Sequence, residues 1–273
     1  MQADSHHIRK RFSQNFLEDQ NVIEKIVDII NPQKSDYIIE IGPGKGALTV
    51  PIFKSVDKLN VIEIDKDLTK LLKKNIGDKN LIIHEHDALK FDYSNFKHTN
   101  LRLIGNLPYR ISTPLLFHLL SYKDMIKNMF FMLQKEVVER ICAKSGTKEY
   151  GRLSVMLQYY CDAELMLIIK PDAFFPSPKV DSAIVKITPL SEAKYELLND
   201  KSFKIIVREA FSQRRKTIRN SLKTFLNETE IKAAGIDTNV RAENLEIKDF
   251  VKLSNLYQKK ARDNWNTNKF NNN

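Results

Sequence analysis

The chain has 273 residues, 42% of them hydrophobic, which is enough for one large and one small domain, each with its own core. It has no run of about 18 apolar residues and no apolar stretch behind the basic N-terminus, so the sequence argues against a membrane span and a secretory signal. Lys and Arg total 44 against 34 Asp and Glu, and this net charge of +10 favours either a polyanionic partner or a solvated lysine-rich surface. Cys142 and Cys161 lack metal-ligand spacing, so we expect buried thiols, no metal site and a cytoplasmic location.

Short β-type runs alternate with helical patterns through the first two thirds of the chain. Helical patterns cover 46–55, 66–76 and 113–122. The alternation predicts an α/β fold with a doubly wound, mainly parallel sheet. The last two strands follow each other with no room for a helix, so we expect the sheet to end in an antiparallel pair. The predicted strands are 37–41, 59–64, 81–85, 101–105, 129–133, 165–170 and 182–187.

The β pattern stops after Pro189, and 195–261 carries apolar residues at helical spacing. We therefore predict three parts: residues 1–189 as the sheet domain with a basic N-terminal arm, 190–263 as a small all-α domain, and 264–273 as a disordered Asn-rich tail. Between Lys201 and Phe225 there are eight basic residues and one acid, Glu209. This local excess predicts a surface for a polyanion.

Three of the eight glycines lie within five residues, in EIGPGKGALT at 40–49, directly after a predicted strand. Such a loop lets a ligand approach the backbone at Gly42, next to free helix N–H groups. Glu63 ends the second strand and can accept bonds from ribose hydroxyls, and Asp87 ends the third strand and can accept from an adenine amine. The spacing also fits the G-x-G-x-x-A pattern of dinucleotide sites, so a nicotinamide enzyme is the alternative.

The fourth strand ends in NLPY, which joins an amide, a proline and an aromatic ring at the same edge of the sheet. The Asn106 side-chain oxygen and the Leu107 carbonyl could accept from an exocyclic base amine and stabilise the charge that develops when it attacks an activated methyl group. Pro108 biases the residue before it toward an extended conformation. Tyr109 offers a stacking face worth about 1–3 kcal/mol for a base. These features favour S-adenosylmethionine as the electrophile and disfavour hydride transfer.

The sequence resembles the KsgA family of small-subunit ribosomal RNA adenine dimethyltransferases over most of its length. The resemblance rests on FSQNFL, EIGPGKGALT, NLPY, FFPSPKVDS and REAFSQRRKTIRNSL, at 12–17, 40–49, 106–109, 174–182 and 208–222. It implies a Rossmann-like S-adenosylmethionine-dependent methyltransferase sheet with a small all-α C-terminal domain. It also implies dimethylation of the N6 amines of two adjacent adenosines in the 3′-terminal hairpin of 16S rRNA, within the 30S subunit and late in its assembly.

The resemblance also implies residue roles. Asn15 and Leu17 would close over the cofactor, and Asn106 would lie between cofactor and target base. Phe174 would pack on the face of the flipped base opposite Tyr109, and the prolines beside it predict a rigid exposed loop. The residue after NLPY is usually Asn in bacterial members and is Arg110 here, which could contact RNA phosphate.

RNA affinity should come from phosphate contacts by two further basic clusters. These are Arg9, Lys10 and Arg11 in the N-terminal arm, and Arg214, Arg215, Lys216 and Arg219 in the helical domain. We expect a monomer with no membrane partner. Two other functions stay open: an Erm-type 23S rRNA methyltransferase, whose sequences usually read Asn-Ile-Pro-Tyr, and a 30S assembly factor that needs no catalysis.

Overall fold

A computed structural model describes residues 15–77, 79–98 and 100–270. The chain divides into two compact units. The first, here the sheet unit, extends to Val138 and resumes over Asp162–Pro189, and the second, here the helical unit, takes Glu139–Cys161 and continues from Leu190. No helix in the described part of the chain is both long and apolar enough to cross a membrane.

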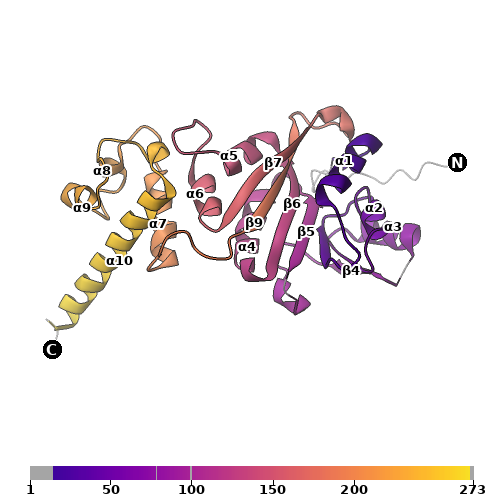
Figure 1. Ribbon diagram of the computed structural model, residues 1–273, viewed down its shortest axis with the longest axis horizontal. Helices are drawn as coiled ribbons and strands as arrows, with labels where there is room; N and C mark the ends of the chain where they lie inside the picture. The colour runs from indigo at the N-terminus through magenta and orange to yellow at the C-terminus, as the bar shows by residue number, and fades with distance from the viewer. Residues whose placement is uncertain (1–14, 78, 99, 271–273) are drawn as a thin grey trace. The chain divides into compact units, whose positions relative to one another are not determined.

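The sheet unit is built on a seven-stranded sheet with the order β4-β3-β2-β5-β6-β9-β7 (Figure 1). Neighbouring strands from β4 to β6 are parallel, and β9 runs antiparallel to β6. The buried, mostly aliphatic residues of β2, β3 and β5 are typical of strands covered on both faces. The strands are β2 (Ile38–Ile41), β3 (Leu59–Glu63), β4 (Leu81–Glu85), β5 (Leu101–Asn106), β6 (Ile126–Gln134), β7 (Cys161–Ile169) and β9 (Ser182–Pro189).

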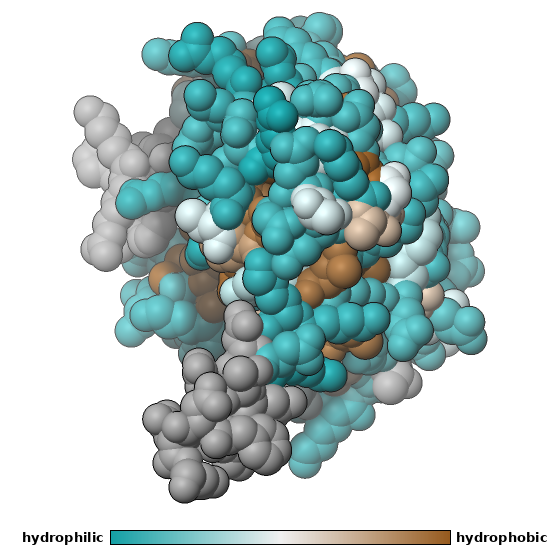
Figure 2. All heavy atoms as spheres, turned by 90° about the vertical axis from the view of Figure 1, so that its left-hand side faces the viewer, coloured by the Kyte–Doolittle hydropathy of each residue, from teal (hydrophilic) through white to brown (hydrophobic). Residues whose placement is uncertain are grey.

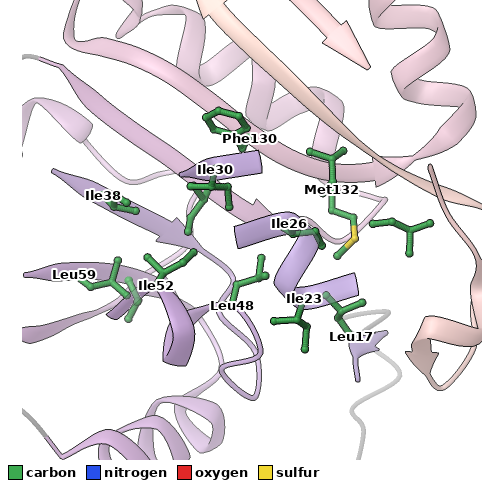
Figure 3. Packing of buried hydrophobic residues seen from close by; sticks show 14 of the residues in the cluster. Leu17, Ile23, Ile26, Ile30, Ile38, Leu48, Ile52, Leu59, Phe130 and Met132 are labelled. Carbon is green, nitrogen blue, oxygen red and sulfur yellow. The ribbon is translucent and has the colours of Figure 1, made fainter. Parts of the chain in front are cut away.

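Helix α1 (Gln20–Ile30) covers part of this sheet with an apolar stripe. Asp19 caps it by accepting from the backbone amides of Asn21 and Val22. Ile23, Ile26 and Ile30 recur at helical spacing and point toward residues of β2, β3 and β6 (Figure 3). Three further helices follow strands in the sheet unit: α2 (Thr49–Phe53), α3 (Lys66–Ile76) and α4 (Ser112–Leu120).

A two-stranded antiparallel sheet joins the start of the described chain to a segment near its middle. β1 (Phe16–Leu17) pairs with β8 (Phe174–Phe175), in the register Phe16 with Phe175 and Leu17 with Phe174. Successive residues of a strand point to opposite sides, so this register places Leu17 and Phe174 on one side and Phe16 and Phe175 on the other.

The helical unit packs around α7 (Asp200–Ala210) and α10 (Ile247–Phe270). Phe203 of α7 and Phe250 of α10 are fully buried, and the Phe250 ring stacks on Phe211 with centroids 5.5 Å apart. Short helices complete it: α6 (Arg152–Gln158), α8 (Ile218–Ser221) and α9 (Glu228–Ala233), while α5 (Lys135–Cys142) spans the boundary between the units. In the face of the molecule in Figure 2, hydrophilic side chains predominate.

Two details differ from the domain limits predicted from sequence. Residues 139–161 belong to the helical unit because Tyr159 packs on Phe203 at 4.7 Å and its hydroxyl donates to the Tyr195 carbonyl at 3.1 Å. Helix α10 continues to Phe270, beyond residue 263 where the sequence placed the end of the helical domain.

Candidate functional site

The carboxyl ends of β2, β3, β4 and β5 surround a cavity of about 430 Å³ in the sheet unit. Small-molecule sites in proteins span about 300–1,000 Å³, and in open α/β sheets they lie at this edge. Of the residues predicted from sequence, the cavity is lined by Asn15, Leu17, Gly42, Glu63, Asp87, Asn106, Leu107, Pro108, Tyr109 and Arg110.

Two glycines allow the backbone to form this cavity. Gly42 turns the chain out of β2 at φ +68°, a conformation that side chains rarely adopt, and its N–H donates to the Ile62 carbonyl at 2.9 Å. Gly105 is the residue before Asn106 in β5, and a Cβ there would collide with the Ile41 carbonyl oxygen. These glycines therefore bring the glycine loop and the NLPY segment together.

Two acidic side chains that line the cavity lie at the carboxyl ends of neighbouring strands, Glu63 as the last residue of β3 and Asp87 just after β4. The Glu63 carboxylate is buried and accepts from the Asp65 backbone N–H at 2.9 Å. Burial raises the pKa of Glu63, although hydrogen bonds from backbone amides, including that of Gly44, partly counteract this. Asp87 accepts from the Leu89 N–H at 3.0 Å through one carboxylate oxygen.

Asn106 is held by the segment that precedes β1. Its Nδ2 donates to the Asn15 carbonyl at 3.2 Å, which fixes the amide orientation and leaves the side-chain oxygen Oδ1 as the acceptor. The next residue, Leu107, is buried and donates its N–H to the Met132 carbonyl at 3.2 Å. The segment that presents the amide is therefore anchored to β6 on one side and to the start of the described chain on the other.

Tyr109 is fixed by its hydroxyl. It lies 2.8 Å from the Ser182 hydroxyl oxygen at the start of β9, and Ser112 donates to the Tyr109 carbonyl at 3.0 Å. Burial raises the pKa of Tyr109, and the hydrogen bond with Ser182 opposes that rise. Anchored at its tip, the half-buried ring is a preorganised surface on the wall of the cavity.

Phe174 does not lie in an exposed loop, and that prediction is wrong. Its side chain is 5% exposed and packs in the core cluster that includes Leu17 and Ala173, because the pairing of β8 with β1 turns it inward. It is not among the residues that line the cavity. Phe175 beside it is 59% exposed.

The predicted RNA contacts fall in different places. Arg110 is exposed at the cavity. Arg214, Arg215 and Lys216 are exposed in the loop between α7 and α8, and Arg219 on α8 lies 3.6 Å from the Glu228 carboxylate. The N-terminal cluster of Arg9, Lys10 and Arg11 lies outside the described residues.

Sequence reasoning missed several residues that the structure places in the cavity. Glu40 is buried there, and Ile64 is a large apolar side chain left 50% exposed. Lys45 lies over the Phe16 ring, 4.6 Å from its centroid, and 3.5 Å from the Glu18 carboxylate. Glu40 could have been found because an acid in a run of buried aliphatic strand residues is unusual.

Comparisons with known proteins agree on one family. A family model described as ribosomal RNA adenine dimethylase matches residues 5–259. The ribosomal RNA small subunit methyltransferase A of Hydrogenovibrio crunogenus is 51% identical over 260 residues, covering 93% of this chain and 98% of the relative. The protein of the same name from Chromobacterium violaceum is 50% identical over 264 residues, covering 94% and 99%.

Solved structures resemble the chain across both units. A dimethyladenosine transferase from Plasmodium falciparum aligns with a TM-score of 0.75 at 28% identity, covering 90% of this chain and 98% of the other. The 23S rRNA methyltransferase ErmE aligns with a TM-score of 0.70 at 23% identity, covering 89% and 100%. Because ErmE is only 23% identical to this chain, its similarity establishes the fold and nothing further.

Proposed function

This chain belongs to the ribosomal RNA adenine dimethylase family, and on that premise we propose that it transfers methyl groups from S-adenosylmethionine to adenosine N6 amines of small-subunit rRNA. The proposed targets are two adjacent adenosines in the 3′-terminal hairpin of 16S rRNA, within the 30S particle. The observation that carries the proposal is the single cavity in which the glycine loop, Glu63, Asp87 and the NLPY segment meet.

The charges in the cavity suit a cationic donor. Glu63 and Asp87 line it, and the Lys45 ammonium beside the glycine loop is already close to Glu18. A dinucleotide would place its pyrophosphate at this loop, against buried carboxyl groups, which is unfavourable. The nicotinamide alternative is therefore disfavoured by electrostatics as well as by family membership.

We assign donor contacts in the order of the strands. Asp87, after β4, would accept from the adenine amine and Glu63, at the end of β3, from the ribose hydroxyls. Ile64, exposed beside Glu63, offers an apolar face for the adenine ring. Gly42 lets the backbone approach the donor, and Asn15 and Leu17 would cover it.

The acceptor base would lie against the NLPY segment. The donor supplies a methyl group activated by its sulfonium. The Asn106 Oδ1, left free to accept because Nδ2 is held by Asn15, and the Leu107 carbonyl would accept the two hydrogens of the target amine. Tyr109, fixed through Ser182, would stack on the extruded base and offset the few kcal/mol that flipping costs. No strong base is needed, since the amine loses its proton only after charge has formed.

RNA phosphates would contact Arg110 and the loop between α7 and α8. The exposed Arg214, Arg215 and Lys216 make that loop strongly basic. Binding by such contacts is steeply salt-dependent and does not read sequence. The choice of 16S over 23S rRNA rests instead on relatives of about 50% identity named small subunit methyltransferases, against 23% identity to ErmE.

One assay tests this function. Undermethylated 30S particles and 23S rRNA are incubated in parallel with labelled S-adenosylmethionine, and the modified nucleotides are mapped. We expect N6-dimethylation of two adjacent adenosines in 30S particles and none with the variant Asn106→Ala. Label confined to 23S rRNA would favour the Erm-type alternative, and binding to 30S without any labelling would favour a purely structural assembly role.

A further inference from the structure

Lys45 is a charged residue of the cavity wall to which the proposed mechanism gives no role. It lies in the glycine loop, and its ammonium is 4.6 Å from the centroid of the Phe16 ring and 3.5 Å from the Glu18 carboxylate. Phe16 is the first residue of β1, and Glu18 directly follows that strand. One side chain therefore joins the glycine loop to β1 at two points.

The Phe16 ring packs directly on the glycine loop. It is 6% exposed, and a Cβ at Gly44 would lie 3.4 Å from two of its ring carbons. A cation over an aromatic ring is attracted by the ring quadrupole, and more strongly where water is excluded. The ion pair with Glu18 is the weaker contact, because both of its side chains are well exposed. Two consecutive residues of the loop, Gly44 and Lys45, thus contact the ring.

The strand that Lys45 contacts leads to the carbonyl that orients Asn106. Asn15 directly precedes Phe16, and its carbonyl accepts from the Asn106 Nδ2 at 3.2 Å. A shift of that carbonyl would let the amide rotate and present its NH₂ group, which can only donate, where the mechanism needs the Oδ1 acceptor. A donor at that point would repel the hydrogens of the target amine and the positive charge that develops on it.

Other contacts hold β1 in the cavity wall without Lys45. Leu17 is buried in the core cluster (Figure 3), β1 pairs with β8, and the Glu18 N–H donates to the Ala173 carbonyl at 2.9 Å. Loss of Lys45 should therefore shift the start of the strand and leave the rest in place. The donor contacts assigned to Glu63 and Asp87 belong to other strands and should persist.

We propose that Lys45 is a positioning residue for methyl transfer. By holding Phe16 against the glycine loop, it fixes the Asn15 carbonyl and, through it, the acceptor face of Asn106. In this role Lys45 touches neither the reacting amine nor the methyl group. The inference rests on the proposed function and adds to it a link between the donor loop and the amide at the acceptor site.

The test variant is Lys45→Ala, and Lys25→Ala, at an exposed lysine of α1, is its matched control. Methyl transfer is measured in a single turnover, with undermethylated 30S particles and labelled S-adenosylmethionine both saturating. Two weak contacts of these kinds sum to about a fivefold effect, so we expect transfer about fivefold slower in Lys45→Ala and unchanged in Lys25→Ala. Lys45→Arg should restore the wild-type rate, since a guanidinium can make both contacts.

Affinity measurements separate positioning from ligand contact. Calorimetry with S-adenosylmethionine should give Lys45→Ala a Kd within about twofold of the wild type, because positioning acts on the chemical step. A Kd that rises as much as the rate falls would show that Lys45 contacts the donor. A rate loss confined to subsaturating 30S would show that it contacts RNA. Either result would overturn the proposal.

Two further measurements follow the path from Lys45 to the amide. In protein labelled with nitrogen-15 at asparagine, the Asn106 Nδ2 signals, identified by their absence in Asn106→Ala, should shift in Lys45→Ala and stay in place in Lys25→Ala. Glu18→Gln should slow transfer less than Lys45→Ala does, and the double variant should be no slower than Lys45→Ala alone. Unshifted amide signals or additive losses would contradict the path.

The two proposals fail differently. Equal rates of transfer by the wild type and Lys45→Ala would overturn the role of Lys45 and leave the proposed function intact. A wild type that transfers no methyl group to 30S particles would instead contradict the proposed function.

Discussion

Glu40→Gln should change how the stability of the ligand-free protein depends on pH. Glutamine has nearly the shape of the protonated acid but cannot ionise. In the wild type, burial raises the pKa of Glu40, so the folded state holds the proton up to about pH 8, whereas the unfolded chain releases it near the ordinary glutamate pKa of 4.5. The folded state therefore binds more protons in that window, and the free energy of unfolding falls as pH rises through it.

The magnitude follows from the same pKa values. Between pH 5 and pH 8, ionisation of Glu40 should lower the free energy of unfolding by about 3 kcal/mol, at 1.36 kcal/mol per pKa unit. Glu63, whose pKa is also raised by burial, acts in the same direction in both proteins. The stability of Glu40→Gln relative to the wild type should thus increase steadily with pH.

Urea unfolding followed by circular dichroism at pH 5, 6, 7 and 8 measures this difference. Glu24→Gln, at an exposed position of α1, is the matched control and should follow the wild type. Parallel curves for wild type and Glu40→Gln across this range would show that Glu40 is ionised in the empty protein, and would refute the reasoning.

The remaining predictions concern other residues of the site. Glu63→Ala should weaken S-adenosylmethionine binding in calorimetry by about tenfold or more, since it removes a hydrogen-bonded carboxylate worth about 1.5–3 kcal/mol; unchanged affinity would contradict the ribose assignment. Asn106→Ala should abolish methylation while 30S binding in sedimentation persists; loss of both would show a structural defect. Phe174→Leu should lower the urea midpoint, with a cost of about 1 kcal/mol, and leave turnover of folded protein near normal; reduced turnover with an unchanged midpoint would restore Phe174 as the stacking ring. Arg215→Gln should reduce the slope of log affinity for 30S against log salt by about 0.7–0.9, and an unchanged slope would remove it from the RNA contacts.

Local sequence was sufficient to locate the seven strands of the large sheet because they contain short apolar runs, although β6 and β7 begin earlier than predicted, at Ile126 and Cys161. Helix α3 matches its predicted range, 66–76, since Asp65 caps one end and Gly77 adopts the left-handed conformation at the other. Helix α2 is shorter than the predicted 46–55, because the glycine loop occupies the chain up to Leu48. Residues 139–161 were assigned to the wrong unit, since their packing on α7 depends on contacts distant in sequence.

For the site, the sequence indicated the residue types at strand ends, but not which of two neighbouring residues is buried in the core. Adjacent Phe174 and Phe175 are chemically identical, and the register of β8 on β1 alone decides that the first is buried and the second exposed. The partner of Tyr109 was equally hidden, because Ser182 lies 73 residues away along the chain.

The site depends on close backbone approach as much as on its side chains. Gly105 lets β5 lie against the Ile41 carbonyl. Gly42, the residue after Ile41, turns the chain away from β2. A side chain at Gly105 would push β5 away from β2 and move Asn106 from the Asn15 carbonyl, although every polar group of the site would remain present. Catalysis by orientation loses rate steeply when the reacting groups shift by about 1 Å, so the spacing of two strands sets the chemistry that the amide can perform.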